Sequence, residues 1–340
     1  MESYAWELSA SLAARGHEVI VLCEALSAPS APPGVKMHIL GRLKFPKPQW
    51  FAAFRYSLRV RRWLQKNQQP NWIVHSHVRC GVHHVLTFHG PPFAHIRRKP
   101  LWKKLSLRVF MHLWLERRDL MAETVRVVVP NSTMIQTMLS DLYPAAISRL
   151  TNPVTPGVSP AIRFRKRDAA PPRGGVIGFI GFEWKRKGLD KAIDIVKLLA
   201  VSRPELMFVV AGPSPHEIAS LFSQVNFHYE LAGRVDTPAF LDRIDLLLHP
   251  ALIEPFGMVI AEALTAGTRV VISDRCGIAA NISTEVAVVL PIESAVESWA
   301  RVANDLFDKQ TFPPLEIRTW DHVAQDYEHI YRSLSKTLGD

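Results

Sequence analysis

Residues 245–273 read DLLLHPALIEPFGMVIAEALTAGTRVVIS, which is a short apolar run, a loop, a helix-like segment and a second apolar run. The two apolar runs, 245–249 and 269–273, have the length of buried strands. The segment between them, 257–266, is long enough for a short helix. A strand, a crossover helix and a second apolar strand form the repeating unit of doubly wound parallel sheets.

The same alternation extends over the whole second half of the chain. The sequence predicts six strands there, at 176–180, 206–211, 227–231, 245–249, 269–273 and 286–290. It predicts five helices between and after them, at 189–200, 216–224, 238–244, 257–266 and 295–307. Short apolar strands alternating with helices indicate a Rossmann-like domain.

The first half also predicts an α/β domain. It opens with a helix at 2–14, which Gly16 would end, and a buried strand at 17–22 follows. The remaining elements are strands at 72–77, 84–89 and 125–129, and helices at 101–120 and 134–142. A helix that leads into a strand is the second half of a β-α-β unit, so we expect the first strand of this domain to be missing.

The domain boundary is predicted in the segment 152–175, where regular patterns stop and Pro, Gly and Arg accumulate. A chain of 340 residues suits two domains, each with its own core. We therefore expect an N-terminal domain over residues 1–157 and a C-terminal domain over residues 158–318.

The composition is that of a globular protein, with 48% apolar and 21% charged residues. The cysteines are far apart and form no CxxC pair, which speaks against a disulfide framework or a zinc site: they are Cys23, Cys80 and Cys276. A reducing cytoplasm fits this pattern. The sequence shows no secretory signal and no apolar run of the roughly 20 residues that a bilayer requires.

The positive charge is concentrated in the first half. Residues 1–160 contain 21 Lys and Arg against 8 Asp and Glu, whereas residues 161–340 contain 20 against 23. The densest stretches, 42–66 and 97–108, interleave cations with aromatic residues and could attract anionic lipid or nucleic acid. A solvated face with ordinary core aromatics is the open alternative. We expect peripheral contact with an anionic membrane and no nucleic acid, because no nucleic-acid-binding motif is present.

Two loops at strand ends carry candidate chemistry, since ligands of parallel sheets collect at the carboxyl ends of the strands. The first loop reads Gly181-Phe182-Glu183-Trp184-Lys185-Arg186-Lys187-Gly188 and then enters a helix. Three consecutive cations beside a positive helix terminus favour a bound anion such as a diphosphate. A solvated basic loop is the alternative interpretation.

The second loop follows the predicted strand 245–249 and contains Glu254, and the helix after it contains Glu262 in its second turn. Gly257 would let a ligand approach the backbone, where free N–H groups could bind phosphate or sugar oxygens. Each carboxylate can accept hydrogen bonds from hydroxyl groups, worth roughly 1.5 to 3 kcal/mol. By spacing alone, the two could equally be a helix-terminal acid and a surface glutamate.

The sequence resembles the family 4 glycosyltransferases, which are retaining enzymes of GT-B fold, over nearly the whole chain. The resemblance rests on the Lys187-Gly188 loop and on two glutamates, Glu254 and Glu262, that are separated by seven residues. Glu262 is followed by AL at 263–264 and by AG at 266–267. Within the family, RKG at 186–188, DLLLHPA at 245–251 and CG at 276–277 are similar to lipopolysaccharide core glycosyltransferases. The implied fold is two Rossmann-like domains that face a central cleft.

The resemblance implies a role for each donor-site residue. Arg186 and Lys187, beside Gly181, would hold the donor diphosphate. Glu262 would bind the ribose hydroxyls and Glu254 the donor sugar. Backbone N–H groups would come from the segment Phe256-Gly257-Met258, and the base would lie against Gly233-Arg234-Val235.

In the first domain, Thr87-Phe88-His89-Gly90 resembles the segment whose histidine approaches the reacting sugar. His89 is therefore the catalytic candidate there, together with Glu254, Lys187 and Arg186 in the donor site. A single histidine is more often structural, and four others lie nearby in sequence: His75, His77, His83 and His84. The last segment, 319–340, resembles the helix that crosses back to the first domain.

The implied reaction is transfer of a sugar from a UDP-linked donor to a cell-envelope glycan or lipid-linked acceptor with retention of configuration. No metal and no cofactor besides the donor is expected, since the cations and a helix terminus can stabilise the leaving group and no DxD pair is present. Two departures are Phe182, where many relatives have Arg, and the missing first strand. Arg186 or Lys185 would then supply the absent charge. A nucleotide-sugar epimerase and a non-catalytic nucleotide-sugar or glycan-binding remnant remain alternatives.

Overall fold

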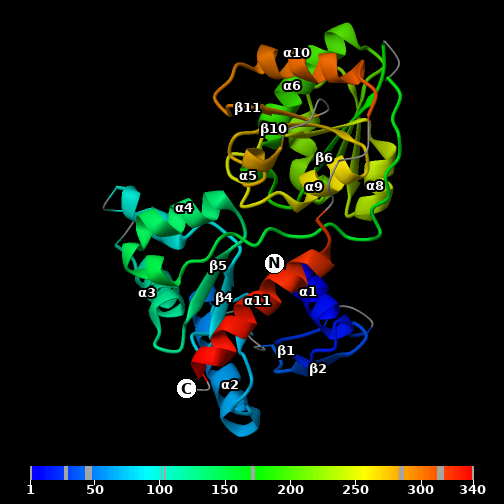
Figure 1. Ribbon diagram of the computed structural model, residues 1–340. Helices are drawn as coiled ribbons and strands as arrows, with labels where there is room; N and C mark the ends of the chain where they lie inside the picture. Colours follow the sequence, from blue (N-terminus) through cyan, green and yellow to red (C-terminus); the bar gives the residue numbers. More distant parts are fainter. Residues whose placement is uncertain are drawn as a thin grey trace. The chain divides into compact units, whose positions relative to one another are not determined.

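The computed structural model describes residues 2–26, 30–42, 48–100, 102, 105–169, 173–282, 287–311 and 318–338. The chain divides into two compact units. The first unit comprises Met1–Gly157 and Arg318–Asp340, and the second comprises Val158–Ile317. Both units are α/β and are built on parallel strands (Figure 1).

The second unit contains a six-stranded sheet with the order β11-β10-β9-β6-β7-β8, in which every neighbouring pair is parallel. The strands are β6 (Val176–Ile180), β7 (Met207–Ala211), β8 (His228–Gly233), β9 (Leu246–His249), β10 (Arg269–Ser273) and β11 (Ala287–Leu290). The predicted strands are confirmed, with ends that differ by one or two residues. The predicted start of the last strand, Val286, lies outside the described residues.

Helices pack on this sheet because its central strands are apolar on both faces. They are α5 (Trp184–Lys187), α6 (Leu189–Ser202), α7 (Pro215–Ile218), α8 (Thr237–Arg243), α9 (Met258–Thr265) and α10 (Val296–Phe307). One core cluster includes the buried side chains of α6 and α10, and a second includes those of α8 and α9. The prediction of one helix at 216–224 was wrong, since α7 is a single turn followed by the 3-10 turn Ala219–Phe222.

The first unit contains two separate parallel sheets. One pairs β1 (Val19–Cys23) with β2 (Val35–Ile39), and the other has the order β3 (His75–Ser76), β4 (Val85–Phe88) and β5 (Val127–Pro130). The sequence did not predict β2. It also predicted a strand over 72–77, of which only the two residues of β3 are paired.

The helices of the first unit are α1 (Glu2–Ala14), α2 (Gln49–Asn67), α3 (Leu107–Met121), α4 (Thr133–Leu142) and α11 (Trp320–Leu338). The sequence missed α2 and began α3 too early: Ser106 caps α3 by accepting a hydrogen bond from the Val109 N–H at 3.2 Å. Leu101, Lys103 and Lys104, which the prediction included, lie outside the described residues.

The C-terminal helix α11 lies beside α1 within the first unit (Figure 1). Tyr4 and Tyr327 are buried and their hydroxyl oxygens are 3.2 Å apart. Arg15 and His17, at the end of α1 and just after it, both contact the Glu328 carboxylate at 2.9 Å. In the part of the chain that the structure describes, no helix is both long and apolar enough to cross a membrane.

Candidate functional site

Glycines stand at the carboxyl ends of three neighbouring strands of the second unit. Gly181 follows β6 and donates its N–H to the Ala211 carbonyl at 2.9 Å, and Gly212 follows β7 and donates to the Gly233 carbonyl at 2.6 Å. A Cβ at Gly212 would lie only 2.7 Å from the Gly181 backbone. The three strand ends therefore pack closely together, and a residue larger than glycine would push them apart.

The basic loop after β6 folds into the single turn α5, which ends at Gly188 with a φ of 80°. The side chain of Lys187 returns over the start of the loop, since a Cβ at Gly181 would meet its Cδ at 2.2 Å. At the other end, a Cβ at Gly188 would lie 2.0 Å from the Pro250 carbonyl oxygen. Gly188 thus lets the loops after β6 and β9 pack together, whereas Gly181 leaves room for the Lys187 side chain.

Two carboxylates balance the cations of this loop. The Lys187 Nζ lies 3.3 Å from the Glu254 Oε2, and the Arg186 Nη1 lies 3.5 Å from the same oxygen. Arg186 also forms a 2.7 Å ion pair with Glu183 and donates to the Ile253 carbonyl. The three cations therefore favour a bound anion less than the sequence predicted, because the protein itself supplies part of the negative charge.

The other two side chains named for this loop point elsewhere. The Lys185 ammonium lies 5.0 Å from the centre of the Trp184 ring, which makes it a cation–π contact. Phe182 is 66% exposed. Of the two cations that could replace the arginine absent at Phe182, Arg186 is the one that contacts Glu254.

Glu254 is an ionised carboxylate in a nearly buried position, with a side chain only 12% exposed. Burial raises the pKa of this carboxyl, but the nearby His249 imidazole and the charges of Lys187 and Arg186 outweigh burial and lower the pKa to about 2. The His249 Nε2 is 3.5 Å from the Glu254 Oε2, and this oxygen makes no hydrogen bond with the described residues. Burial lowers the pKa of His249, and the neighbouring Glu254 carboxylate opposes this shift in part.

The segment between Glu254 and α9 is fixed by a neighbouring loop. Glu254 donates its N–H to the Arg275 carbonyl at 2.9 Å and accepts from the Gly277 N–H at 2.8 Å. Ile278 donates to the Phe256 carbonyl at 2.8 Å. The sequence did not predict this bracing role for the loop after β10, and its only signal was the glycine shortly after a buried strand.

The helix α9 begins at Met258, with Gly257 as its N-cap at a φ of 105°. A Cβ at Gly257 would meet the Ile260 side chain at 2.6 Å, so the cap requires glycine. Gly257 has no side chain that could cap this terminus, and among the described residues the N–H groups of Gly257, Met258 and Val259 make no hydrogen bond. Glu262 lies half-buried in the second turn. The terminus therefore offers donors and a positive dipole next to Glu254.

Arg234 and Val235 follow β8, two strands away from β6 in the sheet. Arg234 is exposed, and Val235 is half-buried against the core cluster that includes α8 and α9. The structure thus brings Arg186 and Lys187 into contact with Glu254, and it places the Lys187 side chain over Gly181. Glu254 precedes the N-cap of α9 by three residues. The structure records no contact of Arg234 with this group among the described residues.

His89 belongs to the first unit, where it follows β4. Its Nε2 lies 2.8 Å from the Nδ1 of His77, and the edge of its ring meets Tyr4 with 4.8 Å between ring centres. Asn131 donates to its backbone carbonyl at 3.2 Å. Burial, with the neighbouring His77, holds the pKa of His89 well below its ordinary value. His89 is therefore a neutral imidazole whose orientation depends on His77.

The remaining histidines have other contacts. His75 joins Tyr331 and Thr87, each at 2.7 Å, whereas His83 bonds the Asp119 carbonyl at 2.9 Å. The Nδ1 of His84 accepts the Val74 N–H at 3.2 Å. The sequence could not separate these structural histidines from the His77–His89 pair.

Family models match both halves of the chain. The model described as Glycosyltransferase Family 4 matches residues 1–157, and the model described as Glycosyl transferases group 1 matches residues 174–309. Among curated proteins, the chain is similar to the lipopolysaccharide glucosyltransferase WaaG of Escherichia coli (strain K12), with 32% identity over 185 residues. That match covers 47% of this chain and 49% of the relative, so it spans about half the length of each.

Solved structures share the fold. A structure of WaaG, a glycosyltransferase involved in lipopolysaccharide biosynthesis, matches with a TM-score of 0.78 and 18% identity, covering 99% of this chain and 91% of its own. Anabaena Alr3699/HepE in complex with UDP and glucose matches with a TM-score of 0.64 and 16% identity, covering 99% and 95%. Together with the two family models, these similarities show that the chain belongs to the family 4 glycosyltransferases and has the GT-B fold.

Proposed function

We propose that the chain is a glycosyltransferase that binds the nucleotide diphosphate of a sugar donor in its second unit. The observation that carries the proposal is the contact of Lys187 and Arg186 with Glu254, directly beside the uncapped start of α9. Cations and unpaired N–H groups bind phosphate oxygens, while a carboxylate binds sugar hydroxyls. Few other ligands need both kinds of group at the same place.

The donor that we propose is UDP-linked, because a GT-B neighbour of this chain has been solved with UDP and glucose. Glu262 would accept hydrogen bonds from the ribose hydroxyls, and Val235 with Arg234 would lie against the base. Glu254 would bind the hydroxyls of the sugar. These roles follow from the family resemblance together with the position of Glu262 one turn after the start of α9.

In the proposed reaction, the bond between the anomeric carbon and the diphosphate breaks, and an acceptor hydroxyl oxygen bonds to the same face of the sugar. The proton of that hydroxyl passes to the departing diphosphate. Lys187, Arg186 and the start of α9 would stabilise the charge that develops on the leaving diphosphate, without a metal ion. Removing one such electrostatic contact typically lowers kcat by about 10²- to 10³-fold. His89 would contact the reacting sugar as a neutral imidazole that can accept a hydrogen bond. If EDTA abolishes turnover, the metal-independent part of this mechanism is wrong.

Calorimetric titration of the full chain with UDP, GDP and ADP tests the donor site. We expect UDP to bind, and we expect Lys187→Met and Glu262→Gln each to weaken binding by at least about tenfold. Lys197→Met is a matched control, because Lys197 forms an ion pair with the exposed Asp194 on α6 and no other ion pair with the described residues. If no nucleotide binds the folded chain, the donor-site proposal fails.

Product analysis separates the proposed transferase from the other functions. We propose a cell-envelope glycan or a lipid-linked glycan as the acceptor. A donor sugar that changes without any acceptor would indicate an epimerase. Nucleotide binding without turnover or donor hydrolysis would indicate a non-catalytic binding protein.

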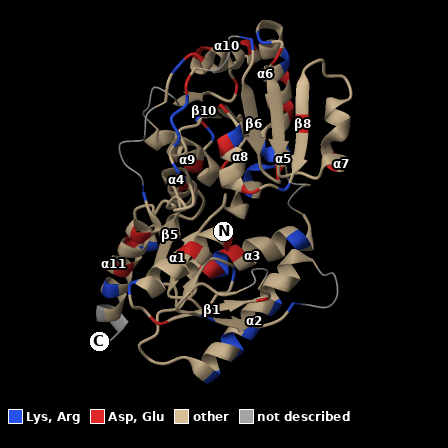
Figure 2. Cartoon of the chain, turned by 90° about the vertical axis from the view of Figure 1, so that its right-hand side faces the viewer, with Lys and Arg blue, Asp and Glu red and all other residues tan. Residues whose placement is uncertain are grey.

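We also propose that the first unit docks peripherally on anionic membrane. The start of α3 exposes an apolar set with fractions of 64–82%, formed by Leu105, Leu107 and Phe110, next to the exposed Arg108. Figure 2 shows Lys and Arg recurring along α2, which packs against α3. Apolar side chains flanked by cations are typical of interfacial helices.

Sedimentation with anionic liposomes at low salt tests this docking. Phe110→Ser should reduce the bound fraction, whereas Val201→Ser, at an even more exposed position on α6 of the second unit, should not. Equal binding of both variants, or no binding of the unmodified chain, would contradict the proposal.

A further inference from the structure

Six residues of the first unit are joined in series by hydrogen bonds, and we call this series the hydroxyl network. It connects α11, β3, β4 and α1 with the backbone after β5 through Tyr331, His75, Thr87, Tyr327, Tyr4 and the Val154 carbonyl. Its bonds measure between 2.5 and 3.2 Å. The network therefore fastens α11 and α1 to the sheet that contains β3 and β4.

The direction of each bond in the network follows from its last member, since a carbonyl oxygen can only accept. Tyr4 donates its only proton to the Val154 carbonyl at 3.1 Å, so Tyr4 accepts from Tyr327 at 3.2 Å. Tyr327 has thereby used its own proton and accepts from the Thr87 hydroxyl at 2.5 Å. Thr87 in turn accepts from His75 at 2.7 Å, which places a proton on the Nε2 of that imidazole.

The other ring nitrogen of His75, Nδ1, accepts a hydrogen bond from the Tyr331 hydroxyl at 2.7 Å. Desolvation and the neighbouring His77 hold the pKa of His75 well below its ordinary value, so the imidazole is neutral and has one donor and one acceptor nitrogen. If the proton were on Nδ1 instead, Thr87 would donate to Nε2, and one bond further along the network would have no proton. The network therefore favours a single tautomer of His75.

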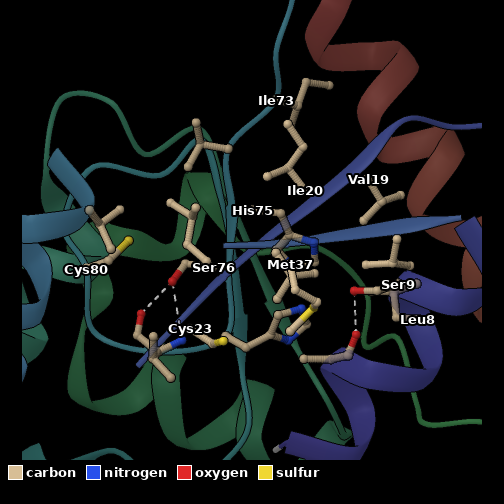
Figure 3. A pocket seen from close by; sticks show the side chains of 18 of the residues that line it. Leu8, Ser9, Val19, Ile20, Cys23, Met37, Ile73, His75, Ser76 and Cys80 are labelled. Carbon is tan, nitrogen blue, oxygen red and sulfur yellow. Dashed lines mark hydrogen bonds between the residues drawn. The ribbon is translucent and has the colours of Figure 1, made fainter. Parts of the chain in front are cut away.

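The same hydrogen bonds set the orientation of the His75 ring. The ring is only half-buried, because it lines a cavity of about 1040 Å³ in the first unit. Figure 3 shows His75 at this cavity, together with Val19 and Ile20 of β1. Since packing does not hold the ring on the cavity side, its orientation depends on the bonds to Tyr331 and Thr87.

The hydroxyl network lies against the pair formed by His77 and His89. The centre of the His75 ring is 4.4 Å from that of His77, and the Tyr4 ring centre is 4.8 Å from that of His89. Thr87 precedes His89 by two positions at the end of β4, and side chains at alternate positions of a strand point to the same face. Two members of the network thus contact the pair, and a third precedes it in the same strand.

We propose that the hydroxyl network positions His89. It fixes the tautomer and the orientation of His75, His75 packs against His77, and His77 holds His89 through their 2.8 Å contact. Thr87 and Tyr327 are thus positioning residues that act on the reacting sugar only through the histidines. The proposal rests on the proposed function, since His89 has this role only if the chain transfers a sugar. It gives α11 a part in the reaction besides its packing on α1.

The tautomer of His75 can be measured independently of activity. Nitrogen NMR of the histidine side chains distinguishes an N–H from an unprotonated nitrogen, and the His75 signals are those lost in His75→Gln. We expect the proton on Nε2 in the full chain. In Tyr327→Phe we expect it on Nδ1, because Thr87 can then donate to Nε2 and no buried hydroxyl is left without an acceptor. A proton on Nδ1 in the unmodified chain, or no change in the variant, would overturn the proposal.

Steady-state kinetics test the effect on the reaction. Thr87→Val removes the hydroxyl with little change in shape, whereas Thr87→Ser keeps it. We expect Thr87→Val and Tyr327→Phe to lower kcat at least about fivefold without changing the donor KM, and Thr87→Ser to retain most of the activity. Tyr56→Phe is a matched control that should leave kcat unchanged, because its hydroxyl bonds only the Leu22 carbonyl among the described residues, at 2.8 Å.

The outcomes separate this proposal from the proposed function. Circular dichroism first confirms that each variant is folded. If the unmodified chain transfers sugar but Thr87→Val keeps its kcat, or if Thr87→Ser lowers kcat as much as Thr87→Val, the network only stabilises the fold and the positioning role is wrong. If the folded, unmodified chain neither binds UDP nor turns over a donor, the proposed function fails and the positioning role fails with it.

Discussion

Replacing Glu254 by glutamine removes one negative charge from the contact with Lys187 and Arg186 and leaves the shape of the side chain almost unchanged. In the native chain, the pKa of this carboxyl is about 2, whereas its ordinary value is 4.5. A carboxylate with a lowered native pKa stabilises the folded state above its unfolded pKa. This contribution disappears as the pH falls through the folded pKa.

The size of the effect follows from that shift. The pKa of Glu254 is lower by about 2.5 in the folded chain than in the unfolded one. At 1.36 kcal/mol per pKa unit, this difference corresponds to about 3 kcal/mol of unfolding free energy at pH 7. At pH 3, the carboxyl is largely protonated in the unfolded chain but still mostly ionised in the folded one, and about 1 kcal/mol remains. We therefore expect Glu254→Gln to destabilise the protein by about 3 kcal/mol at pH 7, and by about 2 kcal/mol less at pH 3.

Urea unfolding followed by circular dichroism measures both values. Glu230→Gln is the matched control, because Glu230 forms a 2.6 Å ion pair with Arg243 in which both side chains are about half exposed. Such exposed pairs contribute only about 0–1 kcal/mol. The reasoning is refuted if Glu254→Gln destabilises no more than the control at pH 7, or if its effect does not shrink between pH 7 and pH 3.

Three further predictions concern the loops and the histidine pair. Gly188→Ala should destabilise by clearly more than Gly16→Ala in urea unfolding: both have a positive φ, which costs about 1–2 kcal/mol, but only at Gly188 would the Cβ also collide with a carbonyl oxygen. Gly181→Ala should displace the lysine side chain above it and weaken UDP binding at least about tenfold in calorimetry, and unchanged affinity would count against that lysine as a phosphate ligand. His77→Gln should lower kcat at least about tenfold without changing the donor KM, because it releases His89, and equal kcat in steady-state kinetics would contradict this positioning role.

The sequence predicted the second unit well because each of its strands is marked by its own apolar composition. The strand β9, for example, is a run of leucines that is fully buried in the sheet, so its composition and its burial agree. The prediction of one helix at 216–224 was wrong because composition and structure disagree there. The composition of this segment permits a helix, but the chain there forms only two short turns.

The first unit was predicted less well because its missed elements have mixed composition. The strand β2 reads VKMHI and buries only Val35 fully, so neither an apolar run nor a regular alternation marked it. The helix α2 carries many cations, so the sequence predicted an anion-attracting stretch there and no helix. Its buried side chains, which include Val60 and Leu64, lie on one helical face, and that spacing was the overlooked signal.

For the candidate site, the sequence supplied the residues but not their contacts. The contact between Lys187 and Glu254 depends on β6 and β9 being neighbours, whereas β7 and β8 come between them in the sequence. No local sequence pattern predicts this order of the strands in the sheet. The bracing of Glu254 by Arg275 and Gly277 likewise joins the loops after β9 and β10, which are adjacent only in the folded sheet.

The ion pair at Glu254 also bears on how a donor would bind. Because the Lys187 side chain is held over Gly181, its cation is already placed at the strand ends and little side-chain entropy remains to be lost on binding. A diphosphate at the start of α9 would share this cation with Glu254 and would not need to recruit it from solvent. Glu254 would then remain ionised, since Arg186 still contacts it at 3.5 Å, and could accept hydrogen bonds from the sugar. The pair that stabilises the unit would thus also organise the donor site, which explains why one substitution should affect both stability and affinity.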